Sequence, residues 1–258
     1  MKIYKTKGIV LRRQDLGEAD RILTIYTANH GKVRAKALGV RKVLSKLGGH
    51  LELFNIVDLS LVEGKGLDTI TACRSHESFS NLRGNLRKTS LAYYVTELID
   101  KLTLEREKDY RIYRLLKEVF GTLNQRTPQQ TDKLYLIVRS FELKFLSLLG
   151  YAPQLKKCLA CGKLIKPNLN YFSLKLGGLL CTRCRKQDIR STKITPNAIK
   201  TIRYLLEKDF SLTARLKLDK PLFKEIRNIV SNFVKYILQK ELKARDFVKK
   251  IEKLERFA

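Results

Sequence analysis

The sequence contains no run of about 18 uncharged apolar residues, the length that a membrane-spanning helix needs. We therefore expect no membrane partner. Near the start, only Gly8 to Leu11 lie between basic residues, which is too short for the apolar core of a signal peptide. Internal repeats and low-complexity segments are also missing. Together these absences predict a cytoplasmic protein.

Sequence motifs of common enzyme classes are missing as well. We find no P-loop, no G-x-S-x-G, no H-E-x-x-H and no H-x-E beside the cysteines. The three histidines, His30, His50 and His76, lie in turn-like or strand-end positions. Acidic residues cluster at Asp15, Glu18 and Asp20, but Arg21 follows directly, so we interpret them as a structural ion-pair cluster. The sequence thus favours a binding protein over an enzyme.

Acidic residues are scarce overall. The chain of 258 residues has 25 Asp+Glu against 53 Lys+Arg, a net charge of +28 and a pI near 10.0. Such an excess repels itself, and a polyanionic partner relieves that repulsion. Nucleic acid is therefore the expected partner. Hydrophobic residues make up 44%, enough for a packed core in one large or two small domains.

The first 80 or so residues alternate as strands do. We expect strands over residues 8–13, 19–29, 32–40, 51–62 and 67–75, with turns at 29–31 and 63–66. Within the third, Val33, Ala35 and Ala37 should face one way and the intervening basic residues the other. Five short strands suit a small OB-fold barrel, although an SH3-like barrel gives the same strand pattern.

Beyond residue 80 the apolar period becomes helical. We expect helices over residues 90–104, 109–124, 131–149, 196–208 and 219–242, with the helices on both sides of the cysteines sharing one core. The predicted fold class is α+β: an N-terminal OB-fold barrel, then an all-α helical domain with an inserted four-cysteine zinc ribbon. The expected domains are the barrel at 1–79, the helical domain at 80–154 and 193–258, and the ribbon at 155–192.

Four of the five cysteines form two C-x-x-C pairs, Cys158 with Cys161 and Cys181 with Cys184, separated by residues 162–180. This is the spacing of a structural zinc site, in which four thiolates fill a tetrahedral shell and leave no position for water. We expect one Zn²⁺ per chain. Cys73 stands alone, and we interpret it as a small buried residue.

The most basic stretch covers residues 31–50, which hold six cations and no acid. Three of these cations alternate along a predicted strand and three follow in the connection. Aligned cations on a barrel face suit the binding of single strands through their phosphates. The candidate DNA-binding residues are Lys32, Arg34, Lys36, Arg41, Lys42 and Lys46, extended by Arg83, Arg87 and Lys88. Tyr4, Tyr26 and Phe54 are candidates for base stacking, although core packing is the better interpretation of each.

These features follow one another in a familiar order. Glu18-x-Asp20-Arg21 precedes Gly31-Lys32 and Ala35-Lys36-Ala37-x-Gly39-x-Arg41-Lys42. After the predicted helices come Leu149-Gly150-Tyr151-x-Pro153-x-Leu155, Cys158-x-x-Cys161-Gly162 and Gly177-Gly178-x-x-Cys181-x-x-Cys184. Across essentially its whole length the chain resembles the RecO family of bacterial recombination mediators. One departure is Ala37, where that family's pattern has Gly.

The resemblance implies a DNA-repair and recombination function without catalytic residues. It implies binding of single- and double-stranded DNA, annealing of complementary strands, and help for RecA in displacing single-strand-binding protein (SSB), in complex with RecR. It further implies contact with the SSB C-terminal tail and association with the nucleoid. Two rivals stay open: a zinc-ribbon RNA- or ribosome-binding factor with the same barrel, and a metal-dependent nuclease, which would need an open metal site.

Overall fold

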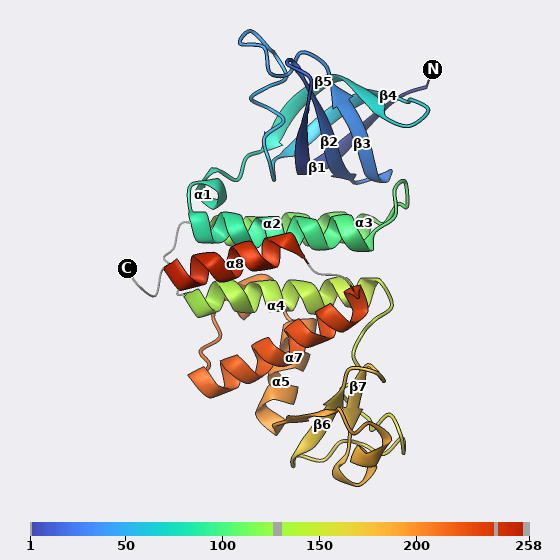
Figure 1. Cartoon of the computed structure of the whole chain (residues 1–258), viewed down its shortest axis with the longest axis vertical. Coiled ribbons are helices and arrows are strands. Elements are labelled where there is room, and N and C mark those ends of the chain that lie inside the picture. Colours follow the sequence, from blue (N-terminus) through green and yellow to red (C-terminus); the bar gives the residue numbers. More distant parts are fainter. Residues whose placement is uncertain (1, 126–130, 240–241, 255–258) are drawn as a thin grey trace. The chain divides into compact units, whose positions relative to one another are not determined.

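The computed structural model describes residues 2–125, 131–239 and 242–254. The chain divides into two compact units, residues 1–126 with 242–258 and residues 127–241. The first contains a β-barrel with its own helices, and the second contains helices and a small sheet (Figure 1). Within the described ranges, no helix combines the length and the apolar character that crossing a membrane requires.

The barrel is built from β1 (Ile3–Leu16), β2 (Asp20–Thr27), β3 (Gly31–Ala37), β4 (Ile56–Val62) and β5 (Asp68–Glu77). Its closed order is β1-β2-β3-β5-β4, because the long β1 pairs with β2 through one half and with β4 through the other. Only the β3–β5 pairing is parallel. This order confirms the expected OB-like barrel. The first strand is longer than expected and starts at Ile3 rather than at residue 8.

Alternation along β3 fills the barrel interior as the sequence indicates. Val33, Ala35 and Ala37 are buried in the barrel core, whereas Arg34 is exposed and Lys36 is half-buried. The methyl group of Ala37 is fully buried, so it contributes to the core at the position where the family pattern has Gly.

The helices of the first unit are α1 (Ser80–Arg83), α2 (Leu86–Leu102), α3 (Tyr110–Asn124) and α8 (Lys243–Leu254). Asp109 caps α3: its carboxylate accepts from the Arg111 backbone N–H at 2.8 Å. Helix α8 packs along α2, and the Glu97 carboxylate on α2 accepts the backbone N–H groups of Lys243 and Ala244 at the start of α8.

The expectation of one helix over 219–242 is wrong at its end. The helix that begins at Lys220 ends at Leu238, because Gln239 takes a left-handed φ of 51°.

The second unit contains α4 (Thr131–Leu148), α5 (Pro196–Glu207), α6 (Phe210–Thr213) and α7 (Lys220–Leu238), with α4 packed against the other three. Between α4 and α5 the chain forms β6 (Asn170–Ser173), β7 (Gly178–Leu180), a 3-10 turn at η1 (Thr182–Gln187) and β8 (Thr192–Ile194), in the sheet order β7-β6-β8. Phe172 on β6 packs edge-on against Phe233 of α7, which joins the sheet to the helices.

This grouping by contact does not follow the four segments drawn along the sequence. Helices α2 and α3 belong with the barrel, α4 to α7 belong with the small sheet, and α8 returns to α2. Helices before and after the cysteines do share cores, as α4 does with α5 and α7, but the helices form two such groups rather than one. The four segments stay a prediction about modules of the sequence.

Candidate nucleic-acid interface and metal site

The outer face of β1, β2 and β3 carries a row of cations fixed by strand register. Arg12 on β1 lies opposite Thr24 on β2, which lies opposite Arg34 on β3. Residues in register on neighbouring strands point to the same face of a sheet, so Arg12 joins the two predicted β3 cations, Arg34 and Lys36. Arg12 is not among the residues predicted from the sequence, because spacing alone does not show which strands pair with β1. Arg34 lies 4.0 Å from the Glu105 carboxylate, an exposed and weak pair.

Lys32 differs from its two neighbours on β3, and its assignment as a DNA contact is not supported. Its side chain is only 8% exposed. The Nζ atom donates to the Asp100 carbonyl at 2.5 Å, the Thr103 carbonyl at 2.7 Å and the Asp100 carboxylate at 3.2 Å. With its ammonium enclosed by these acceptors, Lys32 ties the start of β3 to the end of α2. Strand alternation placed it correctly on the outer side, but helices cover the barrel there.

Three further predicted cations lie in the β3–β4 loop (residues 38–55). The base of this loop is held in place, because the Asp20 carboxylate accepts the Gly39 N–H at 2.7 Å. Arg41 is partly engaged: it donates to the Gly17 carbonyl at 3.0 Å and lies 3.6 Å from the Asp15 carboxylate. Asp15 also binds Arg21 at 2.8 Å, which confirms the structural interpretation of this acidic cluster. Lys42 and Lys46 are exposed and form no ion pair within the described ranges.

The three cations predicted to extend this track lie at α1 and the start of α2. Lys88 is buried, and its Nζ donates to the Gln125 carbonyl at 2.7 Å, so the structure does not support a phosphate contact there. Arg83 is half-buried and donates to Asn55 Oδ1 at 2.6 Å and to the Leu53 carbonyl at 3.2 Å. Arg87 is half-buried as well. Arg83 thus connects α1 to the β3–β4 loop, and Lys88 connects the start of α2 to the end of α3.

The aromatic candidates for base stacking belong to the interior. Tyr26 and Phe54 are fully buried, and Phe54 packs against Phe120 at a centroid distance of 5.5 Å. Tyr4 donates a short hydrogen bond from its hydroxyl to the buried Asp68 carboxylate, and its ring lies 4.4 Å from that of His30. Core packing, the preferred interpretation, is correct for Tyr26 and Phe54.

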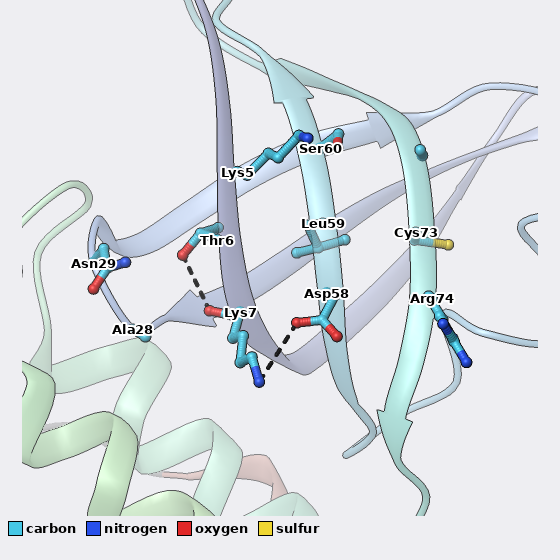
Figure 2. Close-up of a pocket in the computed structure, with 11 residues that line it drawn as sticks. Lys5, Thr6, Lys7, Ala28, Asn29, Asp58, Leu59, Ser60, Cys73 and Arg74 are labelled. Atoms are coloured by element: carbon cyan, nitrogen blue, oxygen red, sulfur yellow. Dashed lines mark hydrogen bonds and ion pairs between the residues drawn. The ribbon is translucent and has the colours of Figure 1, made fainter.

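A second polar area covers β1, β4 and β5 on another part of the barrel. This open hollow has a volume of about 580 Å³. Figure 2 shows Lys7 of β1 beside Asp58 of β4, with Arg74 of β5 on the other side of Asp58 and Lys5 farther along β1, beside Ser60. Strand register sets Asp58 between Lys7 and Arg74, and the Lys7 Nζ lies 3.8 Å from the carboxylate. An acid at its centre makes this hollow a weaker site for phosphates than the face of β1 to β3.

The four cysteines of the two C-x-x-C pairs come together in the second unit. The Sγ atoms of Cys158, Cys161, Cys181 and Cys184 all lie within 4.8 Å of one another, so the group could hold a metal ion. Two turns make this possible: Gly162 takes a φ of +70° directly after the first pair, and η1 follows Cys181. Cys73 lies in the barrel, half-buried, where burial raises the pKa of its thiol to about 11.

The electrostatics of the cluster favour a cation. Burial raises the pKa of the Cys158 thiol, but backbone N–H groups of Cys181, Cys161 and Ala160 hydrogen-bond to its sulfur and bring the pKa down to about 6. Cys184 behaves in the opposite way, because hydrogen bonding to Cys181 and the other thiols raises its pKa to about 12. Sulfurs this close cannot all ionise unless a positive charge lies among them. An all-sulfur set of four suits a soft tetrahedral ion.

Two charged side chains of the surrounding segment, one basic and one acidic, have structural partners. Arg185 lies over the Tyr171 ring at 4.9 Å, and Asp188, the single acid in residues 156–193, accepts from the Ser173 hydroxyl at 2.6 Å. Residues 174–177 join β6 to β7, and Gly177 takes a left-handed φ of 76° at the end of this turn. A side chain at residue 178 would meet the Gln154 carbonyl at 2.4 Å, which explains the Gly there.

Comparison with known proteins covers nearly the whole chain. Residues 1–79 match the family described as Recombination protein O N terminal, and residues 83–246 match Recombination protein O C terminal. A DNA repair protein RecO of Dehalococcoides mccartyi strain BAV1 is 34% identical over 93% of each chain. The DNA repair protein RecO of Thermoanaerobacter sp. strain X514 is 32% identical over 98% of this chain and 100% of its own. That of Roseiflexus sp. strain RS-1 is 33% identical over 98% and 87%.

Proposed function

This chain belongs to the RecO family of DNA repair proteins, and on that basis we propose that it is a recombination mediator. It binds single- and double-stranded DNA and anneals complementary strands. With RecR, and through contact with the SSB C-terminal tail, it helps RecA to load onto SSB-coated DNA. It works in the cytoplasm, associated with the nucleoid.

The observation that carries this proposal is the cationic track on the outer face of the barrel. Arg12, Arg34 and Lys36 share one strand face, and Lys42 and Lys46 continue from the end of β3 into the loop that follows. The face of β2 and β3 is the usual ligand-binding face of an OB-fold. Phosphates of a single strand can follow such a row without any reading of sequence.

The metal of the cysteine cluster is zinc in this proposal, one per chain. Four thiolates complete its shell, so the ion has a structural role and activates no water. When bound, it would link the loop at Cys158 and Cys161 to the turn at Cys181 and Cys184. In this proposal the chain is not an enzyme, and annealing requires no ATP.

A fluorescence annealing assay with SSB-coated complementary strands tests the mediator function. We expect the protein to accelerate annealing of SSB-coated strands without ATP. Together with RecR, it should also speed the loading of RecA onto SSB-coated DNA. Annealing of bare strands but not of SSB-coated ones would contradict the mediator step while leaving DNA binding intact. Strand cleavage that depends on a divalent cation would instead favour the nuclease alternative.

A second candidate is a zinc-ribbon RNA- or ribosome-binding factor, because the charge and the barrel suit RNA equally well. Competition between RNA and DNA oligonucleotides of equal length and sequence separates the two. We expect DNA to compete at least as well as RNA. A clear preference for RNA, with no annealing of SSB-coated DNA, would support the alternative.

A further inference from the structure

Two aliphatic side chains at the tip of the β3–β4 loop are almost entirely in solvent. Val43 is 100% exposed and Leu44 is 93% exposed, the two highest values among the large hydrophobic residues of the described ranges. Single exposed apolar residues are common on protein surfaces. Two adjacent ones at a projecting tip contribute little to the packing of the protein, so a binding function is the better explanation for them. Figure 1 shows this loop, in blue, projecting from the end of the barrel.

The two ends of the loop that carries this tip are anchored on the barrel. Val40 and Leu51 are buried in the barrel core on either side of it. The Arg41 N–H donates to the Ala19 carbonyl at 2.9 Å, and the Ser45 N–H closes a turn on the Lys42 carbonyl at 2.9 Å. Val43 and Leu44 are thus presented on a short turn whose two ends are attached to the barrel, so little ordering is needed before they contact a ligand.

The charges around the tip identify the ligand chemistry. Lys42 precedes Val43 directly and Lys46 follows two residues after Leu44, while residues 31–50 contain no acid. A partner must therefore offer anionic groups on both sides of an apolar surface about two side chains wide. A nucleic acid strand does so, because each base carries an apolar face beside its phosphate, and aliphatic side chains are used elsewhere as wedges between bases.

We infer that Val43 and Leu44 insert against the bases of a DNA strand while Lys42 and Lys46 hold its phosphates. This inference rests on the proposed function and adds a base contact that the cationic track does not require. Inserted in this way, Val43 and Leu44 would separate two neighbouring bases of a bound strand. The pairing edges of these bases would stay open to the complementary strand. The contact is apolar, so it carries no sequence preference.

The test uses the full-length protein and an oligonucleotide with 2-aminopurine, whose fluorescence rises when it loses stacking. Three variants are compared with the wild type. The first carries both Val43→Ser and Leu44→Ser, and the second carries both Lys42→Ala and Lys46→Ala. The matched control is Leu104→Ser, because Leu104 is an apolar side chain of the same unit that is 71% exposed. All of these side chains are at the surface, so folding should be retained; circular dichroism verifies it.

We expect the serine double variant to bind DNA about tenfold more weakly, with an unchanged salt slope and no rise in 2-aminopurine fluorescence at saturation. The lysine double variant should flatten the salt slope by about 1.4 units and keep the fluorescence rise at saturation. Leu104→Ser should match the wild type in both. If the serine variant keeps both the affinity and the fluorescence rise, the inference is wrong.

Other partners of the tip give different results. Flotation with phosphatidylglycerol vesicles that is lost in the serine variant, with DNA binding unchanged, would assign the tip to a lipid surface and overturn the inference. Loss of RecR binding with DNA binding unchanged would assign it to a protein. A wild-type protein that binds no DNA would instead contradict the proposed function itself.

Discussion

Lys32 of β3 donates from its ammonium to Asp100 of α2 twice, to the main-chain carbonyl at 2.5 Å and to the carboxylate at 3.2 Å. A third acceptor, the Thr103 carbonyl, lies 2.7 Å away. Close by, the Arg106 N–H donates to the Lys32 carbonyl at 2.8 Å, so the segment after α2 pairs with the start of β3. Lys32, which the sequence predicts to be part of a DNA-binding face, thus connects the barrel to its helices.

Replacing Lys32 with Met should lower the free energy of unfolding by about 2–4 kcal/mol, because a carboxylate and two carbonyls at the end of α2 would lose their donor. The apolar stem is kept, so the loss reports on the ammonium alone. Lys36→Met on the same strand is the matched control and should cost less than about 0.5 kcal/mol. Urea unfolding measures both. A stable Lys32→Met protein with weakened DNA binding would restore the original assignment.

Gly31 begins β3 with a φ of +62°, and a Cβ there would lie 2.0 Å from the Glu107 carbonyl oxygen. Gly17 has nearly the same φ, +58°, but open space around it. Alanine at residue 17 should therefore cost only the left-handed backbone penalty of about 1 kcal/mol. Alanine at residue 31 should cost clearly more, about 3 kcal/mol or above, because the backbone around Glu107 must move. Equal losses in thermal unfolding would contradict the close approach.

The cationic track predicts the salt dependence of DNA binding. Replacing Lys36 and Lys42 by Ala should flatten the log–log slope of single-strand affinity against salt by about 1.4 units, at about 0.7 per phosphate. Lys5→Ala with Lys7→Ala, in the hollow around Asp58, is the matched control and should change the slope less, because Asp58 already offsets part of that charge. Fluorescence anisotropy across a salt series measures the slopes.

Two outcomes would relocate the track. A larger effect of the Lys5 and Lys7 changes would move the DNA path to β1, β4 and β5. If Arg183→Ala with Arg185→Ala flattens the slope while the Lys36 and Lys42 changes do not, the DNA path runs over the cysteine-rich segment.

The cysteine cluster predicts one zinc ion per chain. Substituting Cys158 by Ser should release it, because Cys158 is the buried member of the set. The small sheet should loosen, while the barrel, whose core contains none of the four cysteines, should keep its stability. Elemental analysis measures the zinc, and tryptic digestion locates the loosened segment. Cys73→Ser, which alters a thiol outside the cluster, should retain the full zinc content. Wild-type protein without bound metal, with all cluster thiols open to titration, would contradict the site.

His30 predicts a modest dependence of stability on pH. Burial and the nearby Arg106 charge lower the pKa of its imidazole below the ordinary value. A base with a lowered pKa binds its proton more weakly in the folded state than in the unfolded state, so stability falls as the pH drops through the unfolded-state pKa near 6.5. The wild type should lose more stability between pH 7.5 and 5.5 than His30→Gln does. Identical losses in urea titrations would exclude His30 as a source.

The sequence alone was sufficient for those features that depend on local pattern. Alternation in residues 32–37 identified the inward face of β3, and the helical period located α3 and α4 closely. The C-x-x-C spacing identified the four thiols that converge, because a tight turn brings each pair together whatever surrounds it. The ends of elements were less well defined: the apolar stripe to residue 242 hid the left-handed break at Gln239.

Tertiary structure decided which cations face solvent. The sequence does not distinguish Lys32, Lys36 and Lys88, which are all predicted DNA contacts. In the structure Lys32 and Lys88 are buried and donate to main-chain carbonyls, whereas Lys36 is half-buried on the outer face of the barrel. Only the register of β1 with β2 shows that Arg12 lies on the same face as the other cations of the track. A sequence records that a side chain is charged and on which side of a strand it lies. Whether a helix covers that side, and which distant strand lies next to it, depends on long-range packing that no local pattern contains.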